Sequence, residues 1–185
     1  MPRIHARIFR IRNYECDAYG HLNNANYLRF MQEIAFDASA AAGYDHKNYE
    51  QMKRTWLIRA TEIEYIAPVL YNDRIEVKTW VADFRRASSR RVYEFRQAGQ
   101  SALIAQAYTD WVFIDAQSGQ LSAIPKEMGP AFFPEGLPEK FPARQPIPDA
   151  PAPPAGAFTL HKQVEWQEID GMQHVNNAIY LDYAS

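Results

Sequence analysis

A short segment near the N-terminus combines residue types that could attack an activated carbonyl. Asp17 and His21 stand four residues apart, and two asparagines follow just before an apolar segment with helical periodicity. The first backbone N–H groups of a helix are unpaired and partly positive, so they can stabilise the oxyanion that forms on attack. A nearby carboxylate can deprotonate water or attack the carbonyl itself. We therefore predict Asp17 as base or nucleophile, with His21 orienting substrate or water.

The two asparagines, Asn23 and Asn24, suit the same site. Either side chain can cap the following helix or hold a water molecule beside the carbonyl. A thioester fits this modest apparatus, because its carbonyl is poorly stabilised by resonance and thiolate is a good leaving group. Tyr27 is a candidate substrate contact, although its spacing also fits the helix core. The predicted reaction converts an acyl thioester and water to free acid and thiol, without a cofactor.

The same pattern occurs a second time, 153 residues later in the chain. Residues 15–28 read ECDAYGHLNNANYL and residues 168–181 read EIDGMQHVNNAIYL, identical at eight of fourteen positions without a gap. Chance does not supply so many matches, so the segment is duplicated. The second copy carries the motif residues Asp170, His174 and Asn177.

Periodicity predicts the elements around the first copy. A strand over residues 4–13 leads through a polar turn into an apolar helix over residues 25–42. Four further strands are expected between turn-forming residues, over 56–66, 74–84, 89–97 and 102–115. One long helix followed by an antiparallel sheet is an α+β layout, in which a curved sheet would wrap the helix.

Proline content divides the chain. Residues 134–156 are rich in proline, which lacks an amide donor and fixes φ, so we expect an extended linker there. One domain is predicted over residues 1–133 and the start of a second repeat over residues 157–185. A strand and half a helix cannot bury a core alone. This tail is expected either to be the start of a truncated tandem repeat or to pack on the first domain or a neighbouring subunit.

Composition argues against several classes of partner. The 20 basic and 22 acidic residues give a formal charge of −2, so no global basic field would attract nucleic acid or an anionic membrane. Cys16 is the one cysteine, which excludes an intrachain disulfide and fits a reducing compartment. No secretory signal or spanning segment is read, and the scattered histidines show no metal-ligand spacing. We therefore expect a cytoplasmic protein without a metal.

The motif resembles the signature of a known family. The pattern D-x-x-G-H-[LV]-N-N-x-x-Y is similar to that of the 4-hydroxybenzoyl-CoA thioesterase-like hotdog proteins, and IEYIAPVLYNDRIEVKTWV resembles their second-to-third strand region. The resemblance covers most of residues 1–125. It implies a hotdog fold with its catalytic carboxylate at Asp17, beside His21 and the Asn23–Asn24 pair. It also implies that hotdog domains pair, as a homodimer or an internal pseudo-dimer.

A tandem pair joined by a long linker is also similar to acyl-ACP thioesterases of the plant and bacterial type. Their working motif resembles D-x-N-x-H-V-N-N and lies in the second half, where this chain has Met172 at the asparagine position. The first copy has Tyr19 at that position. We place the site in the first copy, and the carrier is expected to be either CoA or acyl carrier protein.

A basic cluster is expected at the hairpin between two strands, made by Arg85, Arg86, Arg90 and Arg91. In the hotdog family this edge resembles a channel for the pantetheine arm, and guanidinium groups suit the phosphates of CoA. The same cluster could meet an acidic carrier protein, or could be a solvated hairpin.

Aromatic residues suggest an apolar acyl tunnel, formed in part by Trp80, Phe84, Tyr93 and Trp111. Two other functions remain open. A non-catalytic hotdog protein would bind acyl chains or assemble a complex. A hotdog hydratase would use Asp and His in the order D-x-N-P-x-H, which this chain does not match.

Overall fold

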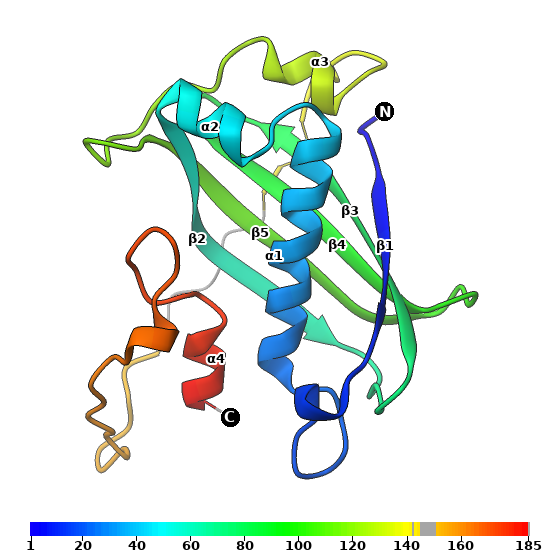
Figure 1. Ribbon diagram of the computed structural model, residues 1–185, viewed down its shortest axis with the longest axis vertical. Coiled ribbons are helices and arrows are strands. Elements are labelled where there is room, and N and C mark those ends of the chain that lie inside the picture. The colour runs from blue at the N-terminus through cyan, green and yellow to red at the C-terminus, as the bar shows by residue number, and fades with distance from the viewer. Residues whose placement is uncertain (142, 145–150, 185) are drawn as a thin grey trace.

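The computed structural model describes residues 1–141, 143–144 and 151–184. In this part of the chain, one antiparallel sheet of order β1-β3-β4-β5-β2 curves around helix α1 (Figure 1). The strands are β1 (His5–Arg10), β2 (Arg54–Tyr65), β3 (Arg74–Phe84), β4 (Ser88–Gln97) and β5 (Leu103–Asp115). The helices are α1 (Asn24–Ala41), α2 (His46–Met52), α3 (Met128–Phe132) and α4 (Ile179–Ala184), with 3-10 turns η1 (Asn13–Glu15) and η2 (Trp166–Glu168). The predicted α+β hotdog layout is confirmed.

The main core lies between α1 and the concave face of the sheet. Helical spacing places Leu28, Met31 and Ile34 on one face of α1, where they are buried against strand residues such as Val77 and Phe95. The strands alternate buried and exposed positions, most regularly in β3 and β4. One sheet face therefore meets the helix, while the other carries polar side chains.

A bulge in β3 decides which of its last side chains face the core. The register with β4 shifts between Val81 and Asp83. Because side chains alternate along a strand, an extra residue reverses the faces beyond it. Phe84 thus joins Val81 in a second hydrophobic cluster, while Asp83 meets polar groups of the outer face.

Two short helices that periodicity did not predict close one end of the core. Helix α2 begins at a capping box in which Asp45 accepts from the Asn48 N–H at 2.9 Å. Its Tyr49 packs with Trp56 of β2 and Phe132 of α3 in the second hydrophobic cluster. A helix of seven residues is too short to show an apolar repeat, so periodicity did not predict it.

The predicted linker contains no helix or strand over its described residues. Pro142, Pro146 and Pro148, on which the linker prediction partly depends, lie outside the described residues. Among the described residues, no helix is long and apolar enough to cross a membrane.

The tail repeats the local structure of the first copy and packs against it. Turn η2 matches η1, and α4 follows where α1 follows in the first copy. The second motif follows the alternating run FTLHKQVEW, residues 158–166, as the first follows HARIFRIRN, and this alternation predicts a strand. The strand does not form, because the run has no neighbouring strand to pair with. Ala178 is buried in the α1 core cluster, and Leu181 packs against that cluster. The tail therefore packs on the first domain.

Candidate functional site

The loop before α1 is organised around the carboxylate of Asp17. Its Oδ1 accepts hydrogen bonds from the backbone N–H of Tyr19 at 2.9 Å and of His21 at 3.0 Å. The Asp17 N–H donates to the His21 carbonyl at 2.8 Å, and Gly20 closes the turn at φ +79°. The loop thus holds Asp17 in one position, as a catalytic carboxylate requires, although the same bonds would also serve a purely structural loop.

The first amides of α1 are occupied by Asn23. Its side chain accepts from the Ala25 N–H at 2.8 Å, and its carbonyl accepts from the Asn26 N–H at 3.0 Å. Asn23 is therefore the helix cap, and the expected oxyanion hole cannot use these two amides while the cap is in place. Asn24 is exposed, and its carbonyl accepts from the Tyr65 hydroxyl at 3.3 Å.

The second copy reproduces this loop bond by bond. Asp170 Oδ1 accepts from the N–H groups of Met172 at 2.8 Å and of His174 at 3.3 Å. The Asn176 side chain accepts from the Ala178 N–H at 2.9 Å in the turn before α4, as the Asn23 side chain accepts from the Ala25 N–H at the start of α1. Gln173 has φ +61°, where the first copy has a glycine. The duplication read from the sequence is therefore also a duplication of conformation.

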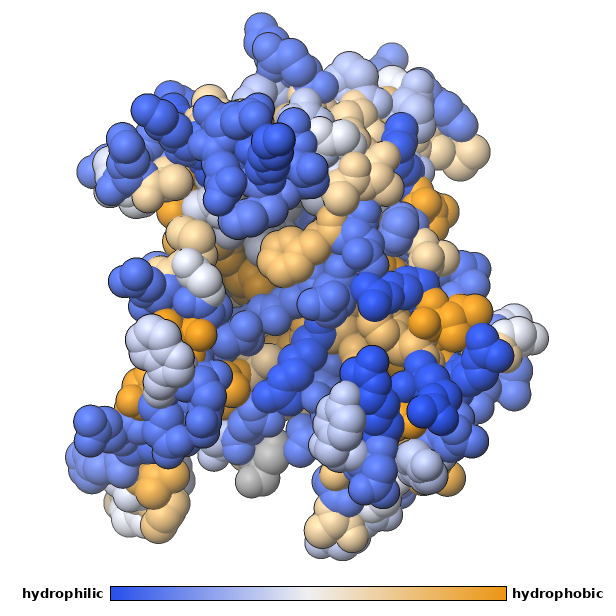
Figure 2. Space-filling model, viewed as in Figure 1, coloured by the Kyte–Doolittle hydropathy of each residue, from blue (hydrophilic) through white to orange (hydrophobic). Residues whose placement is uncertain are grey.

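An apolar cavity of about 510 Å³ lies between the C-terminal half of α1, α2 and the sheet. Its volume falls within the range of sites that bury a small ligand. A hollow with hydrophobic surface at its base is visible below α2 (Figure 2). Its aromatic walls include Phe36, Tyr49, Trp56, Phe84, Trp111 and Phe132.

The cavity only partly follows the aromatic residues that the sequence suggested. Phe84 and Trp111 line it, as expected of a tunnel. Tyr93 is fully buried in the main core, and Trp80 does not line the cavity. Trp56 and Tyr49 were missed. The strand containing Trp56 was predicted, but its edge position beside α2 was not.

The first-copy motif lies away from this cavity. Asp17, His21 and Asn24 do not line the apolar cavity. The wall residues of α1 begin at Ala35, eleven residues after the helix starts, which corresponds to roughly 16 Å along the axis. The loop therefore lies at the start of α1, whereas α2, which borders the cavity, lies near the other end of α1 (Figure 1).

The second-copy motif lies closer to the apolar cavity, because its Asn177 contacts α1 near the cavity wall. Gln32 of α1 hydrogen-bonds to the side chain of Asn177, and the Asn176 amide donates to Gln32 Oε1 at 3.3 Å. Phe36, one helical turn after Gln32, is a wall residue of the cavity. No sequence pattern pointed to Gln32, because its contacts depend on how the tail packs.

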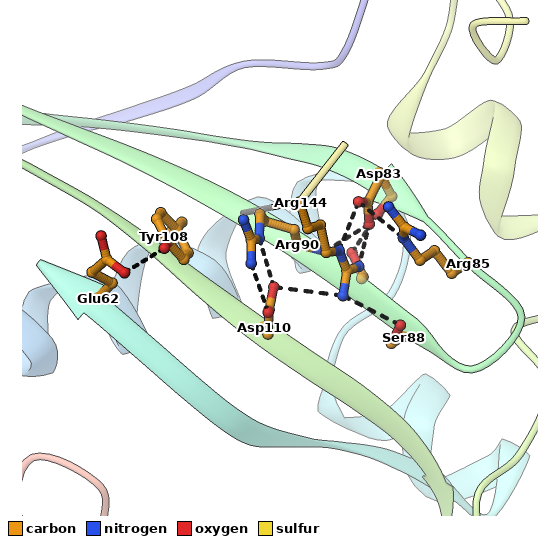
Figure 3. A network of polar contacts seen from close by, with 9 residues as sticks. Glu62, Asp83, Arg85, Ser88, Arg90, Tyr108, Asp110 and Arg144 are labelled. Atoms are coloured by element: carbon orange, nitrogen blue, oxygen red, sulfur yellow. Dashed lines mark hydrogen bonds and ion pairs between the residues drawn. The ribbon is translucent and has the colours of Figure 1, made fainter. Parts of the chain in front are cut away.

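The four arginines of the β3–β4 hairpin do not form one patch. Alternation along β4 sends Arg90 to the outer face and Arg91 to the core side. Arg90 makes a paired contact with Asp110, at 2.7 and 2.8 Å, and Arg85 lies 3.5 Å from Asp83 (Figure 3). The charge of Arg90, one of the predicted phosphate contacts, is therefore already paired with the Asp110 carboxylate.

Arg91 is instead a buried cation in the wall of the apolar cavity. It is 7% exposed, and its Nη1 donates a long hydrogen bond to the Thr79 hydroxyl at 3.5 Å. Its guanidinium carbon also lies 5.9 Å from the Phe132 ring centre. Burial lowers the pKa of Arg91, against the opposing effect of Tyr93 and Tyr49. No carboxylate of the described residues forms an ion pair with it.

The outer-face network includes a residue from the linker region. Arg144 forms a two-point contact with Asp83, lies 3.6 Å from Asp110 and donates to Ser88 at 3.4 Å (Figure 3). Through these contacts Arg144, which follows the first domain, binds to the outer face of the sheet. Nothing in the sequence distinguished Arg144 from other linker residues.

Tyr27 belongs to the core rather than to a substrate site. It is 2% exposed and packs against Phe95 and, edge to face, against Tyr65. Burial raises the pKa of Tyr27 to about 12, with a smaller contribution from Tyr65. Of the two interpretations offered for this residue, the helix core is the one observed.

A second, polar cavity of about 600 Å³ lies beside η1 and the start of α1. Asn23 is the one predicted site residue in its wall. Its cations are paired: Arg7 with Asp37, Arg12 with Glu15, and Arg29 with Asp182. No group of three or more potential metal ligands occurs among the described residues.

Comparison with known proteins agrees with this architecture. The chain is 25% identical over 185 residues to the chloroplastic acyl-[acyl-carrier-protein] hydrolase FATB2 of Cuphea viscosissima, which covers 95% of this chain and 45% of the relative. It is 25% identical over 128 residues to a putative esterase of Aquifex aeolicus, covering 69% of this chain and 95% of that protein. The chain thus spans about half the length of the plant relative.

Solved structures give the same fold over nearly the whole chain. A putative oleoyl thioesterase from Lactobacillus plantarum superposes with a TM-score of 0.78 at 20% identity, covering 98% of this chain and 70% of that one. An acyl-ACP thioesterase from Bacteroides thetaiotaomicron gives 0.77 at 18% identity, with coverages of 98% and 72%. The family model of the thioesterase-like superfamily matches residues 11–132. The chain therefore belongs to the thioesterase-like superfamily, with the hotdog fold.

Proposed function

We propose that this protein hydrolyses an acyl thioester whose acyl group occupies the apolar cavity. The observation that carries the proposal is the position of the second motif loop, which is joined to α1 through Asn177 and Gln32, one turn from the cavity wall at Phe36. An acyl chain in the cavity would direct its thioester toward a loop built to hold a carboxylate.

The chemistry assigned to the loop is that of a general base or nucleophile. A carboxylate held by backbone amides can deprotonate a water molecule or attack the carbonyl, and thiolate then leaves. Oδ1 of Asp170 is fixed by two amides, while Oδ2 forms no hydrogen bond within the described part of the chain. That oxygen is available to a water molecule or a thioester, with His174 four residues along to orient it.

Asp17 holds the equivalent position in the first copy. Its loop has the same hydrogen bonds, but it lies at the other end of α1 from the apolar cavity. For an acyl group in this cavity, we therefore assign the base to Asp170. Asp17, with His21 and Asn24, would serve an acyl group bound on the side of the second repeat.

The substrate class follows from the cavity and from the relatives. The aromatic walls suit an apolar acyl chain or ring. Relatives that are named as acyl-ACP hydrolases, or in one solved structure as a 1,4-dihydroxy-2-naphthoyl-CoA thioesterase, support a carrier thioester. The proposed substrates are acyl-ACP or acyl-CoA, and the products are the free acid and the carrier thiol.

The test is a panel of acyl-CoA and acyl-ACP thioesters with a free-thiol reagent. Wild-type protein is expected to release thiol, and Asp17→Asn/Asp170→Asn is expected to lose about 10²- to 10⁴-fold in rate, as for removal of a general base. Binding of acyl ligand without thiol release would instead indicate an acyl-binding hotdog protein. Hydration of an enoyl-CoA without thiol release would indicate a hydratase. Either result would overturn the proposal.

A further inference from the structure

The contact between α1 and α4 joins equivalent positions of the two copies. Arg29 of α1 forms an ion pair with Asp182 of α4, and the two residues are 153 positions apart. This separation is the same as that between the duplicated motifs. Arg29 therefore meets the residue that occupies its own place in the second copy.

Such a contact marks an approximate two-fold axis. When two like elements pair about a two-fold axis, a residue that touches its own equivalent lies on that axis. The next contact along the two segments runs in the opposite direction: Gln32, which follows Arg29 in α1, meets Asn177, which precedes Asp182 in the turn before α4. The two helices thus cross antiparallel, as Figure 1 shows, in the way that a two-fold axis between them requires.

The apolar part of this contact does not distinguish one copy from the other. Ala178 and Leu181 supply the hydrophobic contact from the tail. The corresponding first-copy residues are Ala25 and Leu28, which are the same residue types. Hydrophobic burial alone would therefore suit a first-copy helix about as well as a second-copy helix at this face of α1.

Charge at the axis does distinguish them. Two first copies paired in this way would bring Arg29 against Arg29, and two second copies would bring Asp182 against Asp182. Only the mixed pair places opposite charges together, and specific pairing commonly combines attraction in the right complex with repulsion in the wrong ones. We propose that Arg29 and Asp182 make this face of α1 selective for the second repeat over another first repeat.

The expected size of the effect is modest. The side chains of Arg29 and Asp182 are 41% and 33% exposed, so solvent weakens both attraction and repulsion. A charge reversal at either position removes the Arg29–Asp182 attraction and also adds repulsion between like charges. We expect about a three- to ten-fold change in the docking equilibrium, which salt should reduce.

The test measures docking of the tail in the full chain by limited proteolysis. Chymotrypsin cleavage after Tyr180 reports the undocked tail. Because position 182 lies only two residues after Tyr180, each rate is divided by that of an unstructured peptide of residues 174–185 with the same residue at position 182. Arg29→Asp and Asp182→Arg should each raise the cleavage rate about three- to ten-fold, while the double exchange should return it to within about two-fold of wild type. Arg29→Gln and Asp182→Asn should have smaller effects, because they remove the attraction without adding repulsion.

Two controls make the result decisive. Arg10→Asp changes a comparable charge on β1, outside the α1–α4 contact, and should leave cleavage after Tyr180 unchanged. Far-ultraviolet circular dichroism establishes that each variant retains the first domain. Single variants that cleave at the wild-type rate, or a double exchange that does not restore docking, would overturn the proposal.

Discussion

Asn23 connects the motif loop to the helix that follows it. Its side chain caps α1 at the Ala25 N–H, while its own N–H donates to the Glu15 carbonyl at 2.9 Å. Glu15 is buried and accepts from the Arg12 N–H at 2.7 Å. Asp17 lies in the loop between Glu15 and Asn23. The hydrogen bond between these two residues therefore closes the loop that holds Asp17.

Replacing Asn23 tests this connection. Asn23→Ala should lower the free energy of unfolding by about 1 kcal/mol, because the Ala25 amide loses its partner at the helix start. Asn24→Ala is the matched control and should change it by less than about 0.5 kcal/mol, since that side chain is exposed. Denaturant titration measures both values, and equal effects of the two variants would exclude the capping role.

Arg91 is a buried cation, and its burial is expected to lower the stability of the fold. A cation buried without a carboxylate is unfavourable, because the protein interior solvates charge poorly. Its position in the wall of the apolar cavity is therefore not explained by stability. Natural proteins can accept lower stability at sites where activity requires it.

Removing this charge should stabilise the fold. Arg91→Met keeps a long apolar side chain and is expected to raise the free energy of unfolding by about 1 kcal/mol or more. The exposed neighbour Arg86→Met should change it by less than about 0.5 kcal/mol. Thermal unfolding provides the comparison, and a lower melting temperature for Arg91→Met would show that the buried guanidinium has stabilising partners.

At the scale of elements, regular periodicity was the reliable guide. The predicted strand over residues 74–84 coincides with β3, and the helix predicted over 25–42 is observed as Asn24–Ala41. The first strand stops at Arg10, before residue 13, because the chain turns into η1. Helices α2 and α3 were not predicted, since their short lengths show no repeat.

The alternation of side chains along β4 could have separated the hairpin arginines from the sequence alone. Arg90 and Arg91 are adjacent in a strand, so they must point to opposite faces. Treating the hairpin arginines as one cluster overlooked this. The run FTLHKQVEW alternates like a strand but has no partner strand, which local pattern cannot reveal.

The η2 turn predicts a pH dependence of the tail. The Glu168 carboxylate accepts from the Glu165 N–H, forms an ion pair with Lys162 and bonds to the Tyr183 hydroxyl. The backbone bond from Glu165 is the largest cause, followed by Lys162, and together they lower the pKa of Glu168 to about 2 from an ordinary value of 4.5. A lowered pKa means that the charged form is favoured in the folded tail.

The sign follows from that shift. The stabilisation by Glu168 is fully present above about pH 4.5 and is lost as the pH falls toward 2. We expect the NMR signal of the Trp166 indole to report progressive loss of tail order over that interval. Glu168→Gln should show the low-pH behaviour at neutral pH. A titration midpoint of Glu168 near its ordinary value would contradict this account.

At the scale of the whole molecule, the assignment of the catalytic carboxylate depends on how the second copy packs against the first. The sequence identified both Asp17 and Asp170 and their common loop. It could not show that the tail packs on α1, because that depends on contacts such as Gln32–Asn177 between residues 145 positions apart. The cavity likewise combines α1, α2, α3 and four strands, so its position relative to the motifs required the fold.

The most direct measurement is thiol release by Asp17→Asn and Asp170→Asn, each assayed alone against wild type with the best thioester of the panel. The account predicts a loss of about 10²- to 10⁴-fold for Asp170→Asn and a smaller loss for Asp17→Asn, because the second loop lies nearer the apolar cavity. Near-normal turnover by Asp170→Asn, with the large loss in Asp17→Asn instead, would contradict the assignment.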